Sequence, residues 1–363
     1  MNRKLTVFHC VALAGLLTSM AFGQGGELRF CLKSEPKTFN PVLVGDDSSE
    51  VVRYLTGGVL VRVNRQTQQL EPELATSWKI SNAGRTITFK LRNGLYFSDG
   101  TPFSANDVAF TVKQLMDPSL HSVTADVFRS GNGNVQVKML AADRVAITFP
   151  AAVAGLDRLF DQVAIMSAKS PKKEMAVLGP FYVADYKPGS YVYLRKNGNY
   201  WKKDAQGHQL PLLDAVKLDI QPNRDIELMR FKRGELDLIN ALDSDYFDKL
   251  AAAAPNEVRD AGPSLDSEQM WFNQVPNAPI PDYKKAWFRS EYFRQAISMA
   301  INRADLCRIV FARHAQPAIG PTSPANRVWF NSKLKPYAYD TQDALNHLAL
   351  AGFKLQNGVL RDS

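Results

Sequence analysis

The chain has 363 residues, of which 45% are hydrophobic and 22% charged, and its formal net charge is +8. This composition is that of an ordinary globular protein and excludes a disordered or low-complexity chain. The basic residues are scattered and their densest runs, such as Lys202-Lys203, are short. Nucleic-acid binding would need a basic stripe or patch, so we expect no nucleic-acid partner.

Residues 1–23 have the regions of a secretory signal peptide. Arg3 and Lys4 precede an apolar run at 7–17, and Ala-Phe-Gly then places small residues where a signal peptidase reads. The run is too short for a membrane-spanning helix, which needs about 20 apolar residues. No cysteine directly follows Gly23. We therefore expect cleavage after Gly23 and a free periplasmic protein without a lipid anchor.

Residues 72–108 predict a strand, two turns and a capped helix in succession. Apolar and polar residues alternate at 86–91, which is the period of a half-buried strand. Asn-Gly and Asp-Gly turn dipeptides follow. Ser104 and Asp107 have the spacing of a capping box, so a helix is expected to begin there and to end near Met116.

The second half of the chain alternates hairpin and helix signals. Residues 182–194 predict two short strands around a Pro-Gly turn, and residues 225–233 predict a short helix. Residues 288–303 have apolar positions at helical spacing. A last helix is expected between a cap at Asp340 and a stop at Gly352.

These segments together resemble the family 5 solute-binding proteins, the peptide- and oligopeptide-binding receptors of ABC importers. The resemblance rests on three blocks: PELATSWKISNAGRTITFKLRNGLYFSDGTPFSANDV at 72–108, the Gly-Pro-Phe, Asn-Tyr-Trp and Gly-Glu-Leu-Asp motifs within 178–239, and WFN, FRSEYFRQAISMAINR and the Ala-Gly-Phe helix within 270–353. It covers Gly26 to Phe353. No single motif is decisive, but the ordered set is specific.

The resemblance implies an α/β bilobal periplasmic binding protein, type II-like, with an extra domain in the first lobe. The first lobe would comprise residues 24–58 and 174–266, the extra domain 59–173, and the second lobe 267–363. In the family the second lobe continues past the Ala-Gly-Phe helix, and the chain then returns to the first lobe. We therefore expect an incomplete second lobe, belonging either to a fragment or to a truncated gene product.

The implied function is capture of peptides or oligopeptides in an interlobe cleft and delivery to an inner-membrane ABC permease, by a monomer without a cofactor. The alternatives are a periplasmic peptide chaperone, a ligand sensor, or a receptor for another small solute such as a nickel complex or a sugar. The sequence has no HExxH, G-x-S-x-G or P-loop motif, and its five histidines form no ligand pair. We expect neither an enzyme nor a metal site.

Two segments are candidates for the ligand site. The loop at 45–49 resembles the family segment that lines the cleft, where Asp46, Asp47 and Ser48 would offer partners to an extended ligand. A turn followed by a helix cap at Asp47 or Ser48 is an equally good interpretation.

The second candidate is an expected strand from Gln269 to Asn273. Gln269, Trp271 and Asn273 would share one face by the two-residue period. The matching family strand crosses at the hinge, with alternate side chains facing the ligand. Trp271 would either supply a side-chain pocket or pack in the core.

Only Cys31 and Cys307 remain once the signal peptide is removed. A secreted protein can pair two cysteines, but these lie far apart in the sequence. We expect two buried, unreactive thiols.

Overall fold

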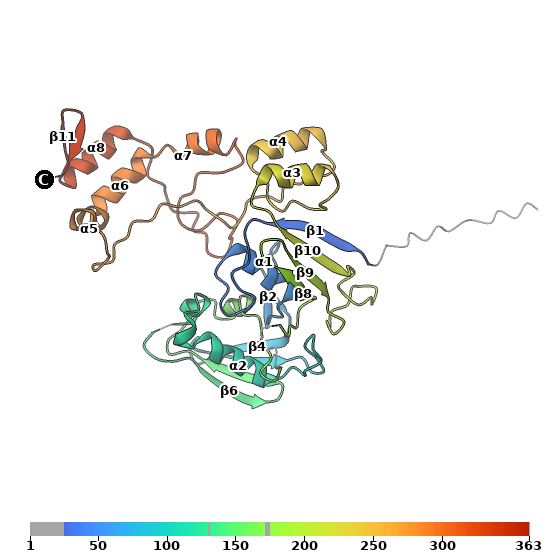
Figure 1. Cartoon of the computed structure of the whole chain (residues 1–363). Helices are drawn as coiled ribbons and strands as arrows, with labels where there is room; N and C mark the ends of the chain where they lie inside the picture. The colour runs from blue at the N-terminus through green and yellow to red at the C-terminus, as the bar shows by residue number, and fades with distance from the viewer. Residues whose placement is uncertain (1–24, 130, 171–174, 363) are drawn as a thin grey trace, which may run out of the picture. The chain divides into compact units, whose positions relative to one another are not determined.

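The computed structural model describes residues 25–129, 131–170 and 175–362 (Figure 1). The expected signal peptide lies outside these described residues. The expected boundaries between the two lobes and the extra domain stay predictions.

The chain divides into two compact units, and each is described by itself. The first unit comprises Met1–Arg62 and Glu71–Ile239, and the second comprises Val63–Leu70 and Asn240–Ser363.

A four-stranded mixed sheet organises one part of the first unit, with strand order β1-β10-β9-β8 (Figure 1). β1 runs parallel to β10, and the other neighbours are antiparallel. The elements of this part are β1 (Glu27–Leu32), α1 (Asp47–Thr56), β8 (Phe181–Lys187), β9 (Tyr191–Lys196), β10 (Ala215–Ile220) and α3 (Arg224–Lys232).

One face of this sheet is the core of that part. Val192, Leu194 and Leu218 are fully buried and pack with Val52 of α1. Because side chains alternate along a strand, the intervening residues of β9 and β10 face the other way. The expected hairpin at 182–194 is confirmed as β8 and β9, and Gly189 takes the left-handed conformation in its turn.

A second sheet, of order β4-β5-β7-β6, is entirely antiparallel, and α2 packs against β6 and β7 (Figure 1). Its elements are β4 (Ala75–Ser81), β5 (Thr86–Leu91), α2 (Ala105–Leu115), β6 (Gln136–Ala141) and β7 (Arg144–Thr148). The expected strand at 86–91 is confirmed, and its apolar residues are all buried. The expected capping box is also confirmed, because Ser104 and Asp107 make both of its hydrogen bonds.

Shorter elements complete this half of the chain. They are the paired strands β2 (Val61–Val63) and β3 (Leu70–Pro72), and three 3-10 helices, η1 (Pro118–Leu120), η2 (Thr124–Phe128) and η3 (Arg158–Asp161).

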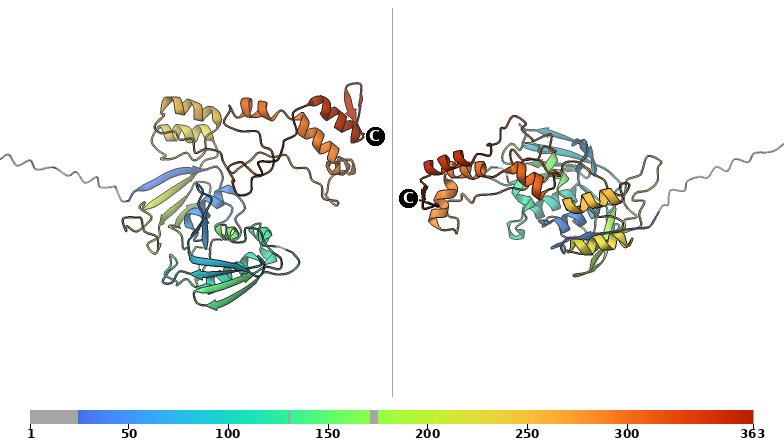
Figure 2. Two further views of the ribbon diagram at one scale, coloured as in Figure 1. Left: turned by 180° about the vertical axis from the view of Figure 1, so that it is seen from behind. Right: turned by 90° about the horizontal axis from the view of Figure 1, so that it is seen from above.

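The second unit is mostly helical. Its elements are α4 (Ser244–Ala253), α5 (Asp282–Arg289), α6 (Glu291–Ala300), α7 (Arg303–Asp305), the π-helical turn η4 (Leu306–Val310), α8 (Thr341–Leu350), β11 (Lys354–Gln356) and β12 (Val359–Arg361). α6 packs against α5 and α8, which both views of Figure 2 show as one orange and red group. β11 and β12 form a hairpin.

The helix indicated by the apolar positions within 288–303 is confirmed as α6, and a separate helix, α5, precedes it. The chain breaks at Ser290, whose backbone is extended and whose hydroxyl accepts a hydrogen bond from the amide of Phe293. A serine cap of this kind starts a new helix, so α5 ends and α6 begins there. The last helix is confirmed: Asp340 caps α8, and Gly352 lies just beyond its end with φ +93°.

Among the described residues, no helix combines the length and apolar composition that a membrane crossing requires. Cys31 is buried as expected, but Cys307 is only half-buried, so the expectation of two buried thiols is wrong for Cys307; in the described part of the chain neither forms a disulfide.

Candidate functional site

The loop after β1 is held by side chains from two directions. Glu35 accepts hydrogen bonds from the hydroxyl of Tyr186 and from the amide of Gly189, 3.2 Å away, in the β8–β9 hairpin. Ser34 shares a 3.0 Å hydrogen bond with Ser48 in α1. These contacts fix the start of the loop against the sheet and the helix that flank it. Glu35 was not predicted as a site residue, although a polar residue in the loop after a buried strand is a usable signal.

The three candidate residues at the end of this loop have different environments. Asp46 is the cap of α1, and its carboxylate accepts from the amide and the hydroxyl of Ser49 at 2.9 and 2.7 Å. Ser48 is only 3% exposed. Asp47 is the exposed member, in the first turn of α1. The predicted helix cap is therefore confirmed, but its position was wrong, since the cap is Asp46 rather than Asp47 or Ser48.

The electrostatics at Asp46 follow from these contacts. Burial raises the pKa of its carboxyl, but the hydrogen bonds from Ser49 and from the backbone of Lys37 outweigh burial and hold the pKa below its usual value. A helix N-terminus also favours a negative charge. Asp46 is thus an anion that caps the helix, and Asp47 is the exposed carboxylate of this loop.

The expected strand from Gln269 to Asn273 is wrong, because the structure describes irregular chain at these positions. A strand needs a neighbouring strand to complete its ladder, and the described pairings include none with this segment. Gln269 instead donates a side-chain hydrogen bond of 2.9 Å to the carbonyl of Pro321. Asn273 accepts one of 3.1 Å from the amide of Val275.

Among residues 269–273, only Phe272 is not exposed. Phe272 packs against Phe288 and Phe293, with ring centroids 5.4 and 5.9 Å apart. Trp271 is 77% exposed in this unit, and Asn273 is exposed as well. Of the two interpretations offered for Trp271, packing in the core of its own unit is therefore excluded. Gln269, Trp271 and Asn273 lie in the second unit and the aspartates lie in the first, so the two groups are separate candidates.

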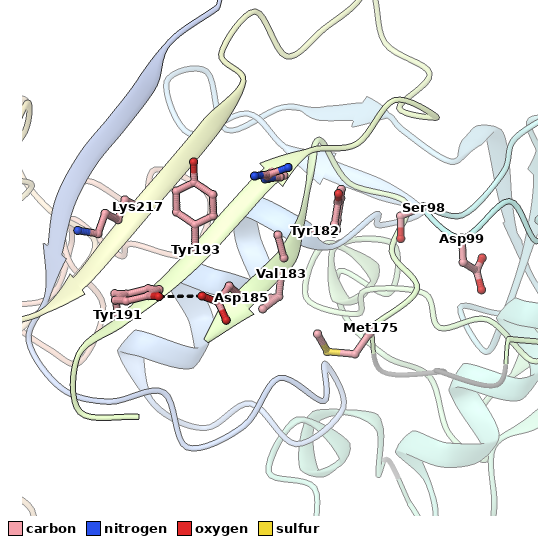
Figure 3. Close-up of a pocket in the computed structure, with 11 residues that line it drawn as sticks. Ser98, Asp99, Met175, Tyr182, Val183, Asp185, Tyr191, Tyr193 and Lys217 are labelled. Atoms are coloured by element: carbon pink, nitrogen blue, oxygen red, sulfur yellow. Dashed lines mark hydrogen bonds between the residues drawn. The ribbon is translucent and has the colours of Figure 1, made fainter. Parts of the chain in front are cut away.

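The first unit also has a broad pocket of about 1000 Å³ on the outward face of its mixed sheet (Figure 3). Tyrosine and charged side chains from β8, β9 and β10 form its floor. The turn at Ser98 and Asp99 lies at its side. This pocket was not predicted from the sequence, although the alternation in β9 predicts an outward-facing row of side chains.

The described residues contain no group of three or more His, Cys, Asp or Glu side chains that is placed to hold a metal ion. The candidate residues are hydrogen-bond donors and acceptors and one large aromatic surface. Such groups suit non-covalent recognition of an extended polar ligand.

Comparison with known proteins identifies the family. Residues 69–362 match the family described as bacterial extracellular solute-binding proteins, family 5 middle. The chain belongs to this family. The match covers both β5 with its capped helix and the helical second unit, so the family 5 assignment rests on most of the chain.

Individual relatives agree with the family 5 assignment. A probable ABC transporter-binding protein of Deinococcus radiodurans is 27% identical, over 93% of this chain and 62% of the relative. The oligopeptide-binding protein AppA of Bacillus subtilis is 25% identical, over 92% of this chain and 61% of the relative. The chain thus spans less than two thirds of the length of these relatives.

A solved structure with the same fold is the periplasmic binding protein DppA of Helicobacter pylori in complex with the peptide STSA. It has a TM-score of 0.70 and 26% identity, over 90% of this chain and 66% of that one. The expected fold class, that of the α/β bilobal binding proteins, is confirmed by this match together with the mixed sheets and helices described above.

Proposed function

We propose that this protein is the periplasmic substrate-binding component of an ABC importer, and that it captures peptides or oligopeptides and delivers them to an inner-membrane permease. The observation that carries the proposal is the family 5 match over residues 69–362. Peptide as the ligand class is supported by the oligopeptide-binding relative of Bacillus subtilis and by the peptide complex of the Helicobacter pylori protein.

The candidate residues suit such a ligand. An extended peptide presents backbone donors and acceptors along its length, and a receptor meets them with backbone and polar side chains. Asp47, Gln269 and Asn273 are exposed polar groups of this kind. Trp271 offers a large apolar surface to one peptide side chain.

We further propose that the chain reaches the periplasm through a signal peptide cleaved after Gly23, remains free of a lipid anchor and acts as a monomer without catalysis. The sequence of residues 1–23 supports secretion. A transport receptor releases its ligand unchanged, so it needs no nucleophile or general base.

Isothermal titration of the secreted protein tests the ligand class. Short and long peptides, including the tetrapeptide Ser-Thr-Ser-Ala, are compared with a nickel–histidine complex and a monosaccharide. The protein is unfolded and refolded first, so that retained ligand is removed. Binding of peptides but not of the other two solutes supports the proposal. Binding of either solute without any peptide would replace peptide as the ligand class.

A further inference from the structure

The outward face of the mixed sheet in the first unit carries a row of tyrosines that the proposed function does not use. Tyr191 and Tyr193 alternate along β9 with the buried Val192 and Leu194. Tyr182 of β8 lies opposite Arg195 in the antiparallel register. All three tyrosines are half-exposed and line the same pocket (Figure 3).

Charged side chains of both signs alternate with these rings. Lys217 of β10 lies opposite Tyr193 in the register, and its ammonium is 5.5 Å from the ring centre of Tyr191. Arg195 lies 5.9 Å from the ring centre of Tyr193. Asp185 accepts a 2.7 Å hydrogen bond from the hydroxyl of Tyr191.

Charge balance excludes a strongly ionic ligand. Arg195 and Lys217 face the pocket together with Asp99 and Asp185. Lys217 also forms an ion pair of 3.3 Å with Asp219. A phosphate or a polycarboxylate would meet these acids, and a polycation would meet the two bases, so like-charge repulsion disfavours both. The pocket instead suits a neutral ligand that makes many hydrogen bonds.

The hydroxyls of two tyrosines are already oriented by carboxylates. Hydrogen bonds to Asp185 and to Glu27 raise the pKa values of Tyr191 and Tyr193, respectively. Each phenol therefore stays protonated and donates a hydrogen bond to the carboxylate. The phenol oxygen can still accept a hydrogen bond from a ligand. A ligand rich in hydroxyl groups can donate to these oxygens and accept from Arg195.

We propose that this tyrosine face, defined as Tyr182, Tyr191, Tyr193, Arg195, Lys217 and Asp185, is a second binding surface that takes a neutral oligosaccharide. Sugar rings present apolar C–H faces, which pack on aromatic rings, and hydroxyl edges, which bond to planar polar side chains. The pocket of about 1000 Å³ has room for several sugar units. The surface would hold the receptor near a glycan while its peptide site stays available.

The test is titration of the secreted protein with three neutral hexasaccharides, maltohexaose, cellohexaose and chitohexaose, and with an acidic hyaluronan hexasaccharide. At least one neutral sugar is expected to bind. Tyr193→Ala and Tyr191→Ala should each weaken that binding by about tenfold, since a buried aromatic contact is lost. Arg195→Gln keeps a polar side chain, removes the guanidinium charge and should weaken the binding by about threefold.

Tyr339→Ala is the matched control, because Tyr339 is an exposed tyrosine of the second unit, and its sugar affinity should stay at the wild-type value. Thermal melting confirms that each variant is folded. Peptide affinity is measured on the same samples and should not change, which separates this proposal from the proposed transport function. No binding by any neutral sugar, tighter binding of the acidic sugar, or unchanged sugar affinity in all three variants would overturn the proposal.

Discussion

At the scale of single residues, some candidate side chains are used to stabilise the fold, and others are exposed and could contact a ligand. The carboxylate of Asp46 is occupied by Ser49, and the hydroxyl of Ser48 is buried against Ser34. Asp47 and Trp271 are exposed. Mutation of the first pair should therefore change stability, and mutation of the second pair should change affinity.

Asp46→Ala should lower the free energy of unfolding by about 1 kcal/mol at neutral pH, because α1 loses its cap. The folded pKa of Asp46 is depressed. Its contribution is therefore complete above the unfolded pKa of about 4 and is lost as the pH falls through the folded value. Urea unfolding of the two proteins at pH 7 and pH 3 should show a gap that narrows at low pH. A gap that widens on acidification would contradict this assignment.

Gln269→Ala and Trp271→Ala should weaken peptide binding and leave the fold intact, since both side chains are exposed. For Trp271 the loss should be about tenfold in affinity, the effect typical of one aromatic anchor. The readouts are peptide titration and thermal melting. Trp329→Ala is the matched control, because Trp329 is an exposed tryptophan of the same unit. Unchanged affinity in the Gln269 and Trp271 variants would remove both residues from the site.

Cys31 should resist alkylation in the folded protein. It is 3% exposed, and burial raises the pKa of its thiol to about 11. At pH 8 about one thiol in a thousand would be ionised, and the thiolate is the reactive form. Mass spectrometry after iodoacetamide treatment should show Cys31 labelled at least about tenfold more slowly than the half-buried Cys307. Equal labelling rates in folded protein would show that Cys31 is reachable.

At the scale of elements, local signals and long-range contacts determine different parts of the structure. β5, α2 and the β8–β9 hairpin are set by alternation, a capping box and a Pro-Gly turn, all within a few residues. Sequence could therefore predict them. The cap at Ser290 is also a local signal, but it was not predicted from the sequence.

The segment from Gln269 to Asn273 shows where local patterns fail. Its alternation was predicted as a strand, but whether a segment becomes a strand depends on a partner elsewhere in the chain. The tyrosine face could be predicted from the sequence only in part. Alternation in β9 predicts that Tyr191 and Tyr193 point away from the core, but the register with Lys217 and Asp185 needed the sheet.

Substitution of Asp107 tests how much the capped start of α2 contributes to the stability of the first unit. Its buried carboxylate accepts hydrogen bonds from the amides of Ser104 and Ala168, at 2.7 and 2.8 Å. Asp107→Ala would leave both half-buried amides without the carboxylate that they donate to, and should lower the free energy of unfolding by about 3 kcal/mol. Asp117→Ala is the control, because it removes an exposed cap from a short 3-10 helix and should cost about 1 kcal/mol or less. Equal losses in urea unfolding would contradict the stated role of Asp107.

At the scale of the whole molecule, the family resemblance was stronger than any motif. The fold class and the family were predicted from the order of many weak signals, and the match over residues 69–362 confirms them. The candidate residues are a different matter, because the aspartates belong to the first unit and Trp271 belongs to the second. The roles of these residues in binding stay predictions, which the variants described above test.

Native mass spectrometry of the protein recovered from the periplasm of its own host tests the central claim most directly, since one spectrum reports the mass of the chain and of any retained ligand. A receptor of peptides should carry adducts whose masses and fragment ions are those of peptides, and the adducts should disappear after unfolding and refolding. Folded protein that carries no peptide, and that takes up none from an added peptide mixture, would contradict the proposed function.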